Sequence, residues 1–186
     1  MATDPHWRLD IGDDGVAWLE FDRQGCSANT PGRDVMQQLA LRLGEIEAAR
    51  PKAVVVVSAK RAGFIAGADI TEFTTLADEE EARGLVRAGQ GVLEGLEALP
   101  CPTVAAIHGF ALGGGLELAL ACRYRVAADD ERLALGLPEV MLGLHPGFGG
   151  TVRAPRLIGA PAALDMMLTG RSLRGARALK LGLVDR

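Results

Sequence analysis

Two carboxylates beside rigid or glycine-rich turns are the strongest candidates for chemistry in this sequence. Glu117 follows three consecutive glycines at 113–115, and Glu139 precedes a second glycine-rich stretch at 143–150. Glu117 falls in the first turn of an expected helix, where side chains lean back toward the helix N-terminus. A pair of carboxylates next to a polarised carbonyl can serve as general base and general acid for the neighbouring carbons.

The glycine-rich turns could themselves hold negative charge. Residues 64–70 and 108–117 follow the same plan, in which a buried strand runs into a turn rich in glycine. Glycines let the backbone approach a ligand closely and leave N–H groups without a strand partner. One N–H from each turn would make an oxyanion hole. The second turn also opens a helix, whose dipole favours negative charge at that end.

Each of these residues also has a purely structural interpretation. The glycines at 113–115 can simply permit tight packing of a helix on a sheet. Glu117 and Glu139 can be first-turn acids that complement a helix dipole. His108 reads as a core residue at a strand end, and His145 as a turn residue. Composition and periodicity alone therefore leave the function open.

Several common catalytic signatures are missing from the sequence. The run Gly-Phe-Gly-Gly at 147–150 is not followed by a glycine at position 152, so the dinucleotide-binding fingerprint fails. Neither a phosphate-binding Gly-Lys-Ser/Thr loop nor a Gly-x-Ser-x-Gly elbow occurs. The histidines and cysteines are scattered without metal-ligand spacing, so we expect no metal site.

Bulk properties narrow the class of protein. The 186 residues are enough for one domain, and 48% of them are hydrophobic, which is ample for a core. The net charge is −4 without a Lys/Arg run, so we expect no nucleic acid partner. Three cysteines in no paired spacing favour a reducing, cytoplasmic location. The apolar runs are too short for a membrane span.

The order of the expected elements is that of an α/β protein. Residues 7–11 and 16–21 alternate around a turn and predict a β-hairpin. Unbroken apolar runs at 54–57 and 103–107 predict buried parallel strands, and the helix between them opens with a capping box at Asp78 and Glu81. Further helices are expected from about Pro31 to Pro51, over 116–122, 152–158 and 161–168, and over 173–181 with Gly182 as its C-cap.

Taken together, three stretches resemble the enoyl-CoA hydratase/isomerase (crotonase) family: residues 64–70, 107–119 and 137–151. The ending, with Thr169-Gly170 and Gly182-Leu183-Val184, follows the same pattern. The resemblance covers essentially the whole chain. It implies an α/β fold, the family's spiral of ββα units, over residues 1–186.

The resemblance assigns roles to particular residues. The thioester carbonyl would be held between the backbone N–H groups of Ala68 and Gly114, the oxyanion hole. Glu117 would act mainly as the base, and Glu139 would deliver a proton to the α-carbon. Coenzyme A is part of the substrate, so no separate cofactor is implied. The residues expected to contact the acyl-CoA are Ala66, Ala68, Asp69, Ile70, Thr71 and Gly114.

The presence of both carboxylates favours one reaction within the family, hydration of trans-2-enoyl-CoA in fatty-acid β-oxidation. The alternatives are another acyl-CoA reaction on the same fold (Δ3-Δ2 isomerisation, decarboxylation or thioester hydrolysis) and an inactive fragment or scaffold. Residues 107–109 and 155–159 most resemble the N-terminal hydratase part of multifunctional fatty-oxidation α subunits.

The resemblance also concerns the end of the chain. The sequence stops before the family's C-terminal helices, so we expect a domain truncated at its C-terminal end, with exposed apolar surface. We expect a trimer-type homo-oligomer or part of a multifunctional α subunit.

Overall fold

The computed structural model describes residues 5–67, 72 and 76–186. Its main feature is a five-stranded sheet in the order β1-β2-β3-β4-β6. β1 and β2 pair antiparallel, with Trp7 opposite Phe21, and the remaining neighbours pair parallel. The predicted hairpin and the predicted βαβ unit are therefore confirmed. The strands are β1 (Trp7–Ile11), β2 (Val16–Phe21), β3 (Ala53–Ser58), β4 (Thr103–Ile107) and β6 (Tyr124–Ala127).

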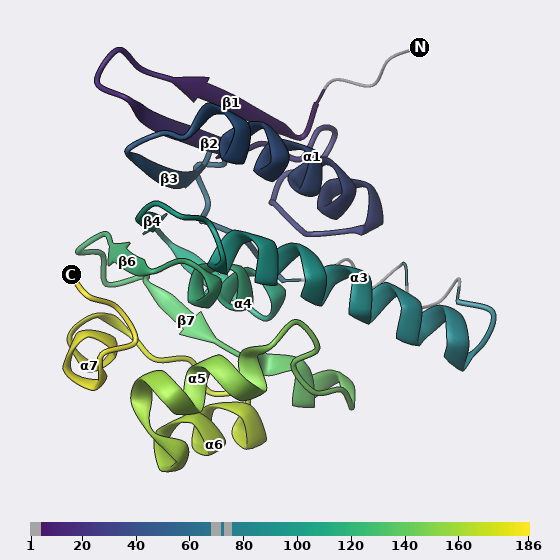
Figure 1. Ribbon diagram of the computed structural model, residues 1–186. Coiled ribbons are helices and arrows are strands. Elements are labelled where there is room, and N and C mark those ends of the chain that lie inside the picture. The colour runs from purple at the N-terminus through teal and green to yellow at the C-terminus, as the bar shows by residue number, and fades with distance from the viewer. Residues whose placement is uncertain (1–4, 68–71, 73–75) are drawn as a thin grey trace.

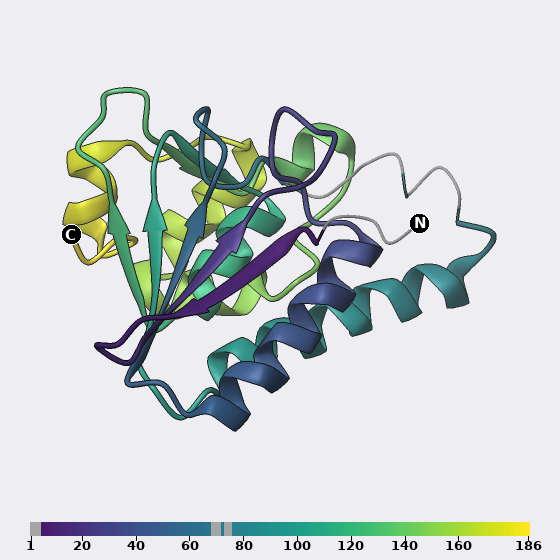
Figure 2. The ribbon, with the colours of Figure 1, turned by 90° about the horizontal axis from the view of Figure 1, so that it is seen from above.

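The helices lie beside this sheet in two groups (Figure 1). α1 and α3 run side by side along one side of the sheet and contact each other (Figure 2). α4 lies between α3 and the later helices, and α5 and α6 pack together in the second half of the chain. The helices are α1 (Arg33–Ala49), α3 (Glu79–Glu97), α4 (Gly114–Ala121), the 3-10 helix η1 (Pro138–Leu142), α5 (Gly150–Ile158), α6 (Ala160–Thr169) and α7 (Gly175–Leu181).

Local signals explain where α3 begins. The Asp78 carboxylate accepts a hydrogen bond from the Glu81 N–H at 2.9 Å, as a capping box requires. The Glu81 side chain, however, accepts from the N–H of Ala77 at 3.0 Å instead of returning to Asp78. The predicted helix start is confirmed, whereas only the Asp78 half of the capping box forms.

The sequence analysis did not predict a second sheet, which has two strands. β5 (Phe110–Leu112) and β7 (Ala134–Gly136) pair parallel, and an isolated bridge joins Ile65 to Ala111. These strands are three residues long, too short for an alternation to stand out. Together they bring the turn after Ile65 beside the turn that opens α4.

Other boundaries shifted by a residue or two. α1 begins at Arg33 because Gly32 stays extended as its N-cap, and it ends at Ala49, followed by Arg50 in the left-handed region as its C-cap. α7 begins at Gly175 and not at 173, since Leu173 forms an antiparallel bridge with Leu135. The predicted C-cap is confirmed, with Gly182 at φ 78°.

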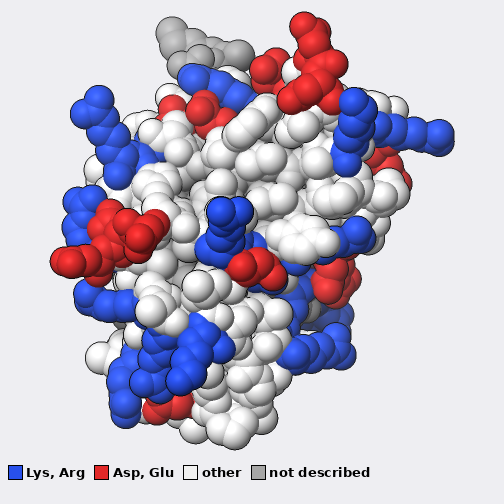
Figure 3. Space-filling view, turned by 90° about the vertical axis from the view of Figure 1, so that its left-hand side faces the viewer, with Lys and Arg blue, Asp and Glu red and all other residues white. Residues whose placement is uncertain are grey.

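Charges on the surface are mixed. On the face shown in Figure 3, Lys and Arg side chains are interspersed with Asp and Glu side chains and with uncharged surface. Several charged side chains of the described residues form ion pairs, for instance Arg153 with Glu97 at 2.6 Å. Among the described residues, none of the helices has the length and apolarity needed to cross a membrane.

Candidate active site

Glu117 is a buried carboxylate with two fixed hydrogen bonds. Its side chain projects from the first turn of α4, and the residue is 1% exposed. Its Oε1 accepts the backbone N–H groups of Phe148 and Gly150, each at 2.7 Å. A Cβ on Gly150 would stand only 3.0 Å from this oxygen, so a glycine permits the close approach. The loop before α5 therefore holds Glu117 in one position.

Burial has the largest effect on the pKa of Glu117. Loss of water raises its pKa from 4.5 to about 7. The N–H donors of Gly150 and Phe148 and the charge of Arg153 oppose this rise, whereas the nearby charge of Glu139 adds to it. At neutral pH the group can therefore both accept and release a proton, as a general base must during turnover.

Glu139 comes from the opposite side of the site, on η1. One of its oxygens, Oε1, lies 3.0 Å from the position that a Cβ on Gly113 would occupy. The other, Oε2, is buried and has no hydrogen-bond donor among the described residues. Burial raises the pKa of Glu139, and the nearby charge of His145 opposes the rise. An oxygen without a donor is best satisfied when the carboxyl carries a proton or contacts a ligand.

Both carboxylates line one cavity of about 300 Å³, a volume near the lower end of ordinary ligand pockets. Gly114 and Ala66 line the same cavity. The structure thus brings together four of the predicted site residues from three different segments: the turn at Ala66, the start of α4, and η1. The remaining wall is mainly apolar and includes Leu85, Val86, Leu142, Leu144 and Phe148.

The three glycines at the start of α4 have three different roles. Gly113 has φ 50°, a conformation that disfavours other residues. Gly114 is the first residue of α4, so its N–H has no acceptor within the helix. A Cβ on Gly115 would lie 2.6 Å from Ile65, so this glycine serves close packing. The packing interpretation of the triplet therefore holds for Gly115, whereas the oxyanion-hole role of Gly114 stays a prediction.

The other glycine-rich turn, at residues 64–70, is only partly described. Ala68, Asp69, Ile70 and Thr71, all predicted to bind the acyl-CoA, lie outside the described residues. The turn before them is fixed, because the Ala66 N–H donates to the Asn29 carbonyl at 2.8 Å.

Asn29 anchors that turn and was not predicted to do so. Its side chain is buried and donates to the Phe21 carbonyl at 2.8 Å and to Ser58 Oγ at 3.0 Å. It also accepts the N–H of Arg23 at 2.8 Å. One amide thus joins three segments of the chain, which explains why an asparagine stands at position 29.

Sequence reasoning also missed two residues of the cavity wall. Phe148 was noted in a failed dinucleotide motif and His145 as a turn residue, and both lie in the family-like stretch 137–151, but neither was predicted as a site residue. Both line the cavity. His145 Nδ1 lies 3.1 Å from the Pro146 carbonyl, which orients its ring. The family-like stretch 137–151 was the one signal that pointed to this region, and it did not show which of its side chains face the cavity.

Potential metal ligands are not clustered among the residues that the structure describes. No group of three or more His, Cys, Asp and Glu side chains is placed to hold a metal ion in that part of the chain. All three cysteines are free thiols, Cys26 at the surface and Cys101 and Cys122 in the interior. Burial raises the pKa of the Cys122 thiol to about 12, so this thiol stays protonated.

Comparison with known proteins gives consistent matches over the whole chain. Residues 12–186 match the sequence model of the family described as enoyl-CoA hydratase/isomerase. The fatty acid oxidation complex subunit alpha of Shewanella frigidimarina is 48% identical over 186 residues, and that of Shewanella loihica is 49% identical over 183. These matches cover 100% and 98% of this chain but 26% of each relative, so the chain spans about a quarter of their length.

Solved structures agree with the sequence matches. The enoyl-CoA hydratase from Bacillus anthracis superimposes with a TM-score of 0.88 at 38% identity, covering 97% of this chain and 69% of that one. An enoyl-CoA hydratase from Geobacillus kaustophilus gives 0.91 at 33% identity, covering 100% and 69%. The predicted fold is therefore confirmed.

Proposed function

This chain belongs to the enoyl-CoA hydratase/isomerase family, and we propose from that premise that it adds water across the double bond of trans-2-enoyl-CoA. The observation that supports this reaction best is the pair Glu117 and Glu139 in one cavity, both with raised pKa values. The relatives named fatty acid oxidation complex subunit alpha support a place in fatty-acid β-oxidation.

Substrate activation begins at the start of α4. In the proposed complex the thioester carbonyl oxygen accepts the Gly114 N–H and, as a second donor, the N–H of Ala68. Both donors together with the N-terminal dipole of α4 favour the negative charge that develops on this oxygen. The carbonyl is thereby polarised, and the β-carbon becomes open to attack by water.

The two carboxylates then divide the proton transfers. Ionised Glu117 takes a proton from water while the water oxygen bonds to the β-carbon. The π electrons of the double bond move toward the thioester and form an enolate held by the oxyanion hole. Protonated Glu139 gives its proton to the α-carbon, which completes the 3-hydroxyacyl-CoA. Proton exchange with solvent returns Glu117 to the ionised and Glu139 to the protonated form.

The assignment of base and acid follows from the surroundings of each group. Glu117 accepts two N–H donors, which favour a carboxylate over a carboxyl. Glu139 has an oxygen without a donor, so a proton on that oxygen is free to leave toward the substrate. Ionised Glu139 also raises the pKa of Glu117, so the pair favours a state with one proton, which Glu139 carries in the active form.

Further features of the proposal concern partners and location. Coenzyme A enters as part of the substrate, and the chemistry described needs no metal or redox cofactor. We expect the domain to act in the cytoplasm, as its three free thiols favour. We also expect it to work as a homo-oligomer of the trimer type or as part of a multifunctional α subunit.

Product analysis tests this function against its alternatives. Crotonyl-CoA and 3-hexenoyl-CoA are incubated separately with the protein, and the thioesters are separated and identified by mass. We expect crotonyl-CoA to gain the mass of one water. Conversion of 3-hexenoyl-CoA to 2-hexenoyl-CoA without any hydrated product from crotonyl-CoA would identify an isomerase instead. Free coenzyme A as the main product would identify a thioesterase.

A further inference from the structure

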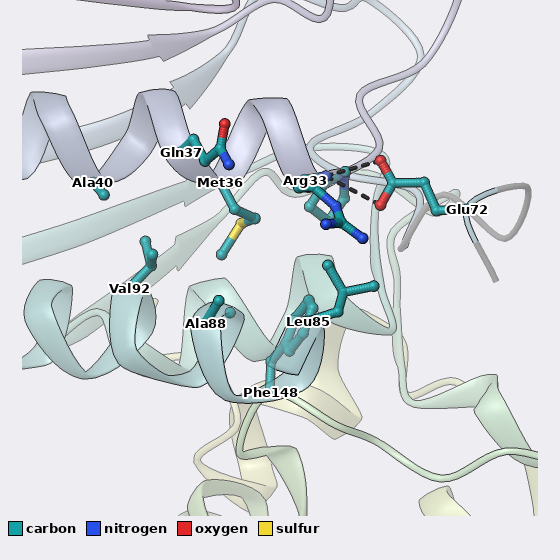
Figure 4. Close-up of a pocket in the computed structure, with 12 residues that line it drawn as sticks. Arg33, Met36, Gln37, Ala40, Glu72, Leu85, Ala88, Val92 and Phe148 are labelled. Atoms are coloured by element: carbon teal, nitrogen blue, oxygen red, sulfur yellow. Dashed lines mark hydrogen bonds between the residues drawn. The ribbon is translucent and has the colours of Figure 1, made fainter. Parts of the chain in front are cut away.

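An apolar groove runs between α1 and α3, next to the catalytic cavity. It has a volume of about 140 Å³, and its walls are mainly apolar. Figure 4 shows Met36 pointing from α1 toward α3, with Leu85, Ala88 and Val92 on the opposite side. At one end, the N–H of Arg33 donates to both carboxylate oxygens of Glu72, at 2.8 and 3.1 Å, so this rim is polar.

The groove and the catalytic cavity share a wall. Leu85 and Phe148 line both spaces. The Phe148 ring reaches α3 on one edge, where a Cβ on Gly89 would stand 2.4 Å from Cε1. Its other edge reaches α4, where a Cβ on Gly114 would stand 3.4 Å from Cδ2. The ring therefore spans the gap between α3 and the proposed oxyanion hole.

The position of this ring has a consequence for an acyl chain. The thioester carbonyl sits at Gly114 in the proposed complex, and the acyl chain extends from that point. Pro31, which lines the groove, also approaches Gly114, since its Cγ would stand 3.4 Å from a Cβ there. The apolar groove thus begins close to the reacting group. The ring of Phe148 lies between the groove and the catalytic cavity.

We propose that Phe148 limits the length of the acyl chain by separating the catalytic cavity from the groove, which would hold the distal methylenes of a longer chain. This inference rests on the proposed function, because it assumes an acyl-CoA with its carbonyl at Gly114. Two features of the groove indicate an alkyl chain as its occupant. The groove adjoins the catalytic cavity, and its walls are apolar except for Arg33 and Glu72 at the rim.

Binding and turnover across chain lengths test this role of Phe148. Wild type and Phe148→Ala are titrated with butyryl-CoA and decanoyl-CoA by calorimetry, and assayed with crotonyl-CoA and trans-2-decenoyl-CoA. The backbone N–H that holds Glu117 remains in the variant, so ratios between long and short chains report the ring alone. We expect Phe148→Ala to raise the preference for the ten-carbon chain by about tenfold or more, since each added apolar contact in a pocket changes affinity by a similar factor.

A second substitution separates groove occupancy from a general loosening of the site. Ala88 lies on the exposed side of α3 and lines the groove but not the catalytic cavity. Ala88→Leu should leave the chain-length ratio of the wild type unchanged and should cancel the gain in the Phe148→Ala background. This double-mutant cycle assigns the coupling to the groove.

Two outcomes would overturn the inference. The first is an equal ratio of long-chain to short-chain affinity in wild type and Phe148→Ala. The second is a wild type that already binds decanoyl-CoA better than butyryl-CoA and loses this preference in Ala88→Leu. Calorimetry measures the binding preference between the two chain lengths even if the protein does not turn over its substrate. Acyl-CoA binding without any hydration of crotonyl-CoA would reject the proposed function and leave the chain-length result to be judged on its own. Poor folding of Phe148→Ala would move the same test to Phe148→Leu.

Discussion

At the scale of single residues, the account depends on two glutamates with different surroundings. Glu117 is held by two backbone N–H groups, whereas Glu139 has an oxygen without a donor among the described residues. The first arrangement suits a base that must keep its position, and the second suits an acid that must release a proton. Neither difference is visible in the sequence, where both residues are simply acids near a glycine-rich turn.

Replacing either glutamate by glutamine should remove most of the turnover. Glu117→Gln and Glu139→Gln keep the size of the side chain but cannot exchange a proton, and general acid–base catalysis contributes about 10²- to 10⁴-fold. We expect kcat for crotonyl-CoA to fall by a factor in this range, while the affinity for butyryl-CoA changes little. Near-wild-type turnover in either variant would contradict the two-carboxylate mechanism.

The raised pKa of Glu117 predicts the pH dependence of activity. Because the base must be ionised, kcat/KM should fall below pH 7, with an apparent pKa of about 7 in the free enzyme. The coupling with Glu139 means that this value belongs to the pair. A pH–rate profile from pH 5 to 9 measures it. Constant activity down to pH 5 would show that Glu117 is not the base.

The same group links stability to pH. Its folded pKa of about 7 lies above the ordinary value of 4.5, so its stabilising contribution is complete below about pH 4.5 and is lost as the pH rises through 7. Glu117→Gln lacks this dependence. Relative to wild type, the variant should therefore gain unfolding free energy between pH 5 and pH 8, by up to about 3 kcal/mol. Denaturant titrations at both pH values check the sign.

At the scale of elements, long periodic segments could be predicted and short ones could not. The helix over 79–97 has an apolar face and an N-cap, and the strands at 53–58 and 103–107 contain apolar runs of five and four residues. β5 and β7 are three residues each, and their pairing depends on contacts between distant segments. The position of the two glycine turns depends on exactly these short strands, so motif similarity, and not periodicity, predicted the site.

Close packing at the start of α4 gives a prediction about stability. A Cβ at position 115 would lie 2.6 Å from both the Cβ and the carbonyl oxygen of Ile65. Gly115→Ala should therefore destabilise the fold by about 1–3 kcal/mol, the usual cost of overpacking. Gly84→Ala in α3 is the matched control, because nothing lies within 4 Å of its new methyl group. That control should be neutral or stabilising by up to about 1 kcal/mol.

At the scale of the whole molecule, one exposed apolar surface is prominent. η1 and α6 contact each other and present Met141 at 74% exposure and Leu168 at 69%, together with Leu142 and Leu164. Surfaces of this kind mark interaction sites in soluble proteins. The sequence analysis expected an exposed apolar surface from the family resemblance, and these four exposed side chains of η1 and α6 are candidates for it.

This surface leads to a prediction about self-association. We expect the chain to form oligomers at micromolar concentration, measured by size-exclusion chromatography with light scattering. Met141→Glu and Leu168→Glu should shift the equilibrium toward monomer. Leu41→Glu, at an equally exposed position on α1, is the control and should have no effect. A monomeric wild type would reject the predicted homo-oligomer.

The most direct test of the central claim is a spectrophotometric assay of hydration. The 186-residue chain is mixed with crotonyl-CoA, and the absorbance of the conjugated enoyl thioester is followed against time, with the Glu117→Gln, Glu139→Gln double variant in parallel. The account predicts a loss of absorbance for the wild type, with 3-hydroxybutyryl-CoA as product, and almost none for the double variant. No loss with the wild type, or an equal loss with both proteins, would contradict it.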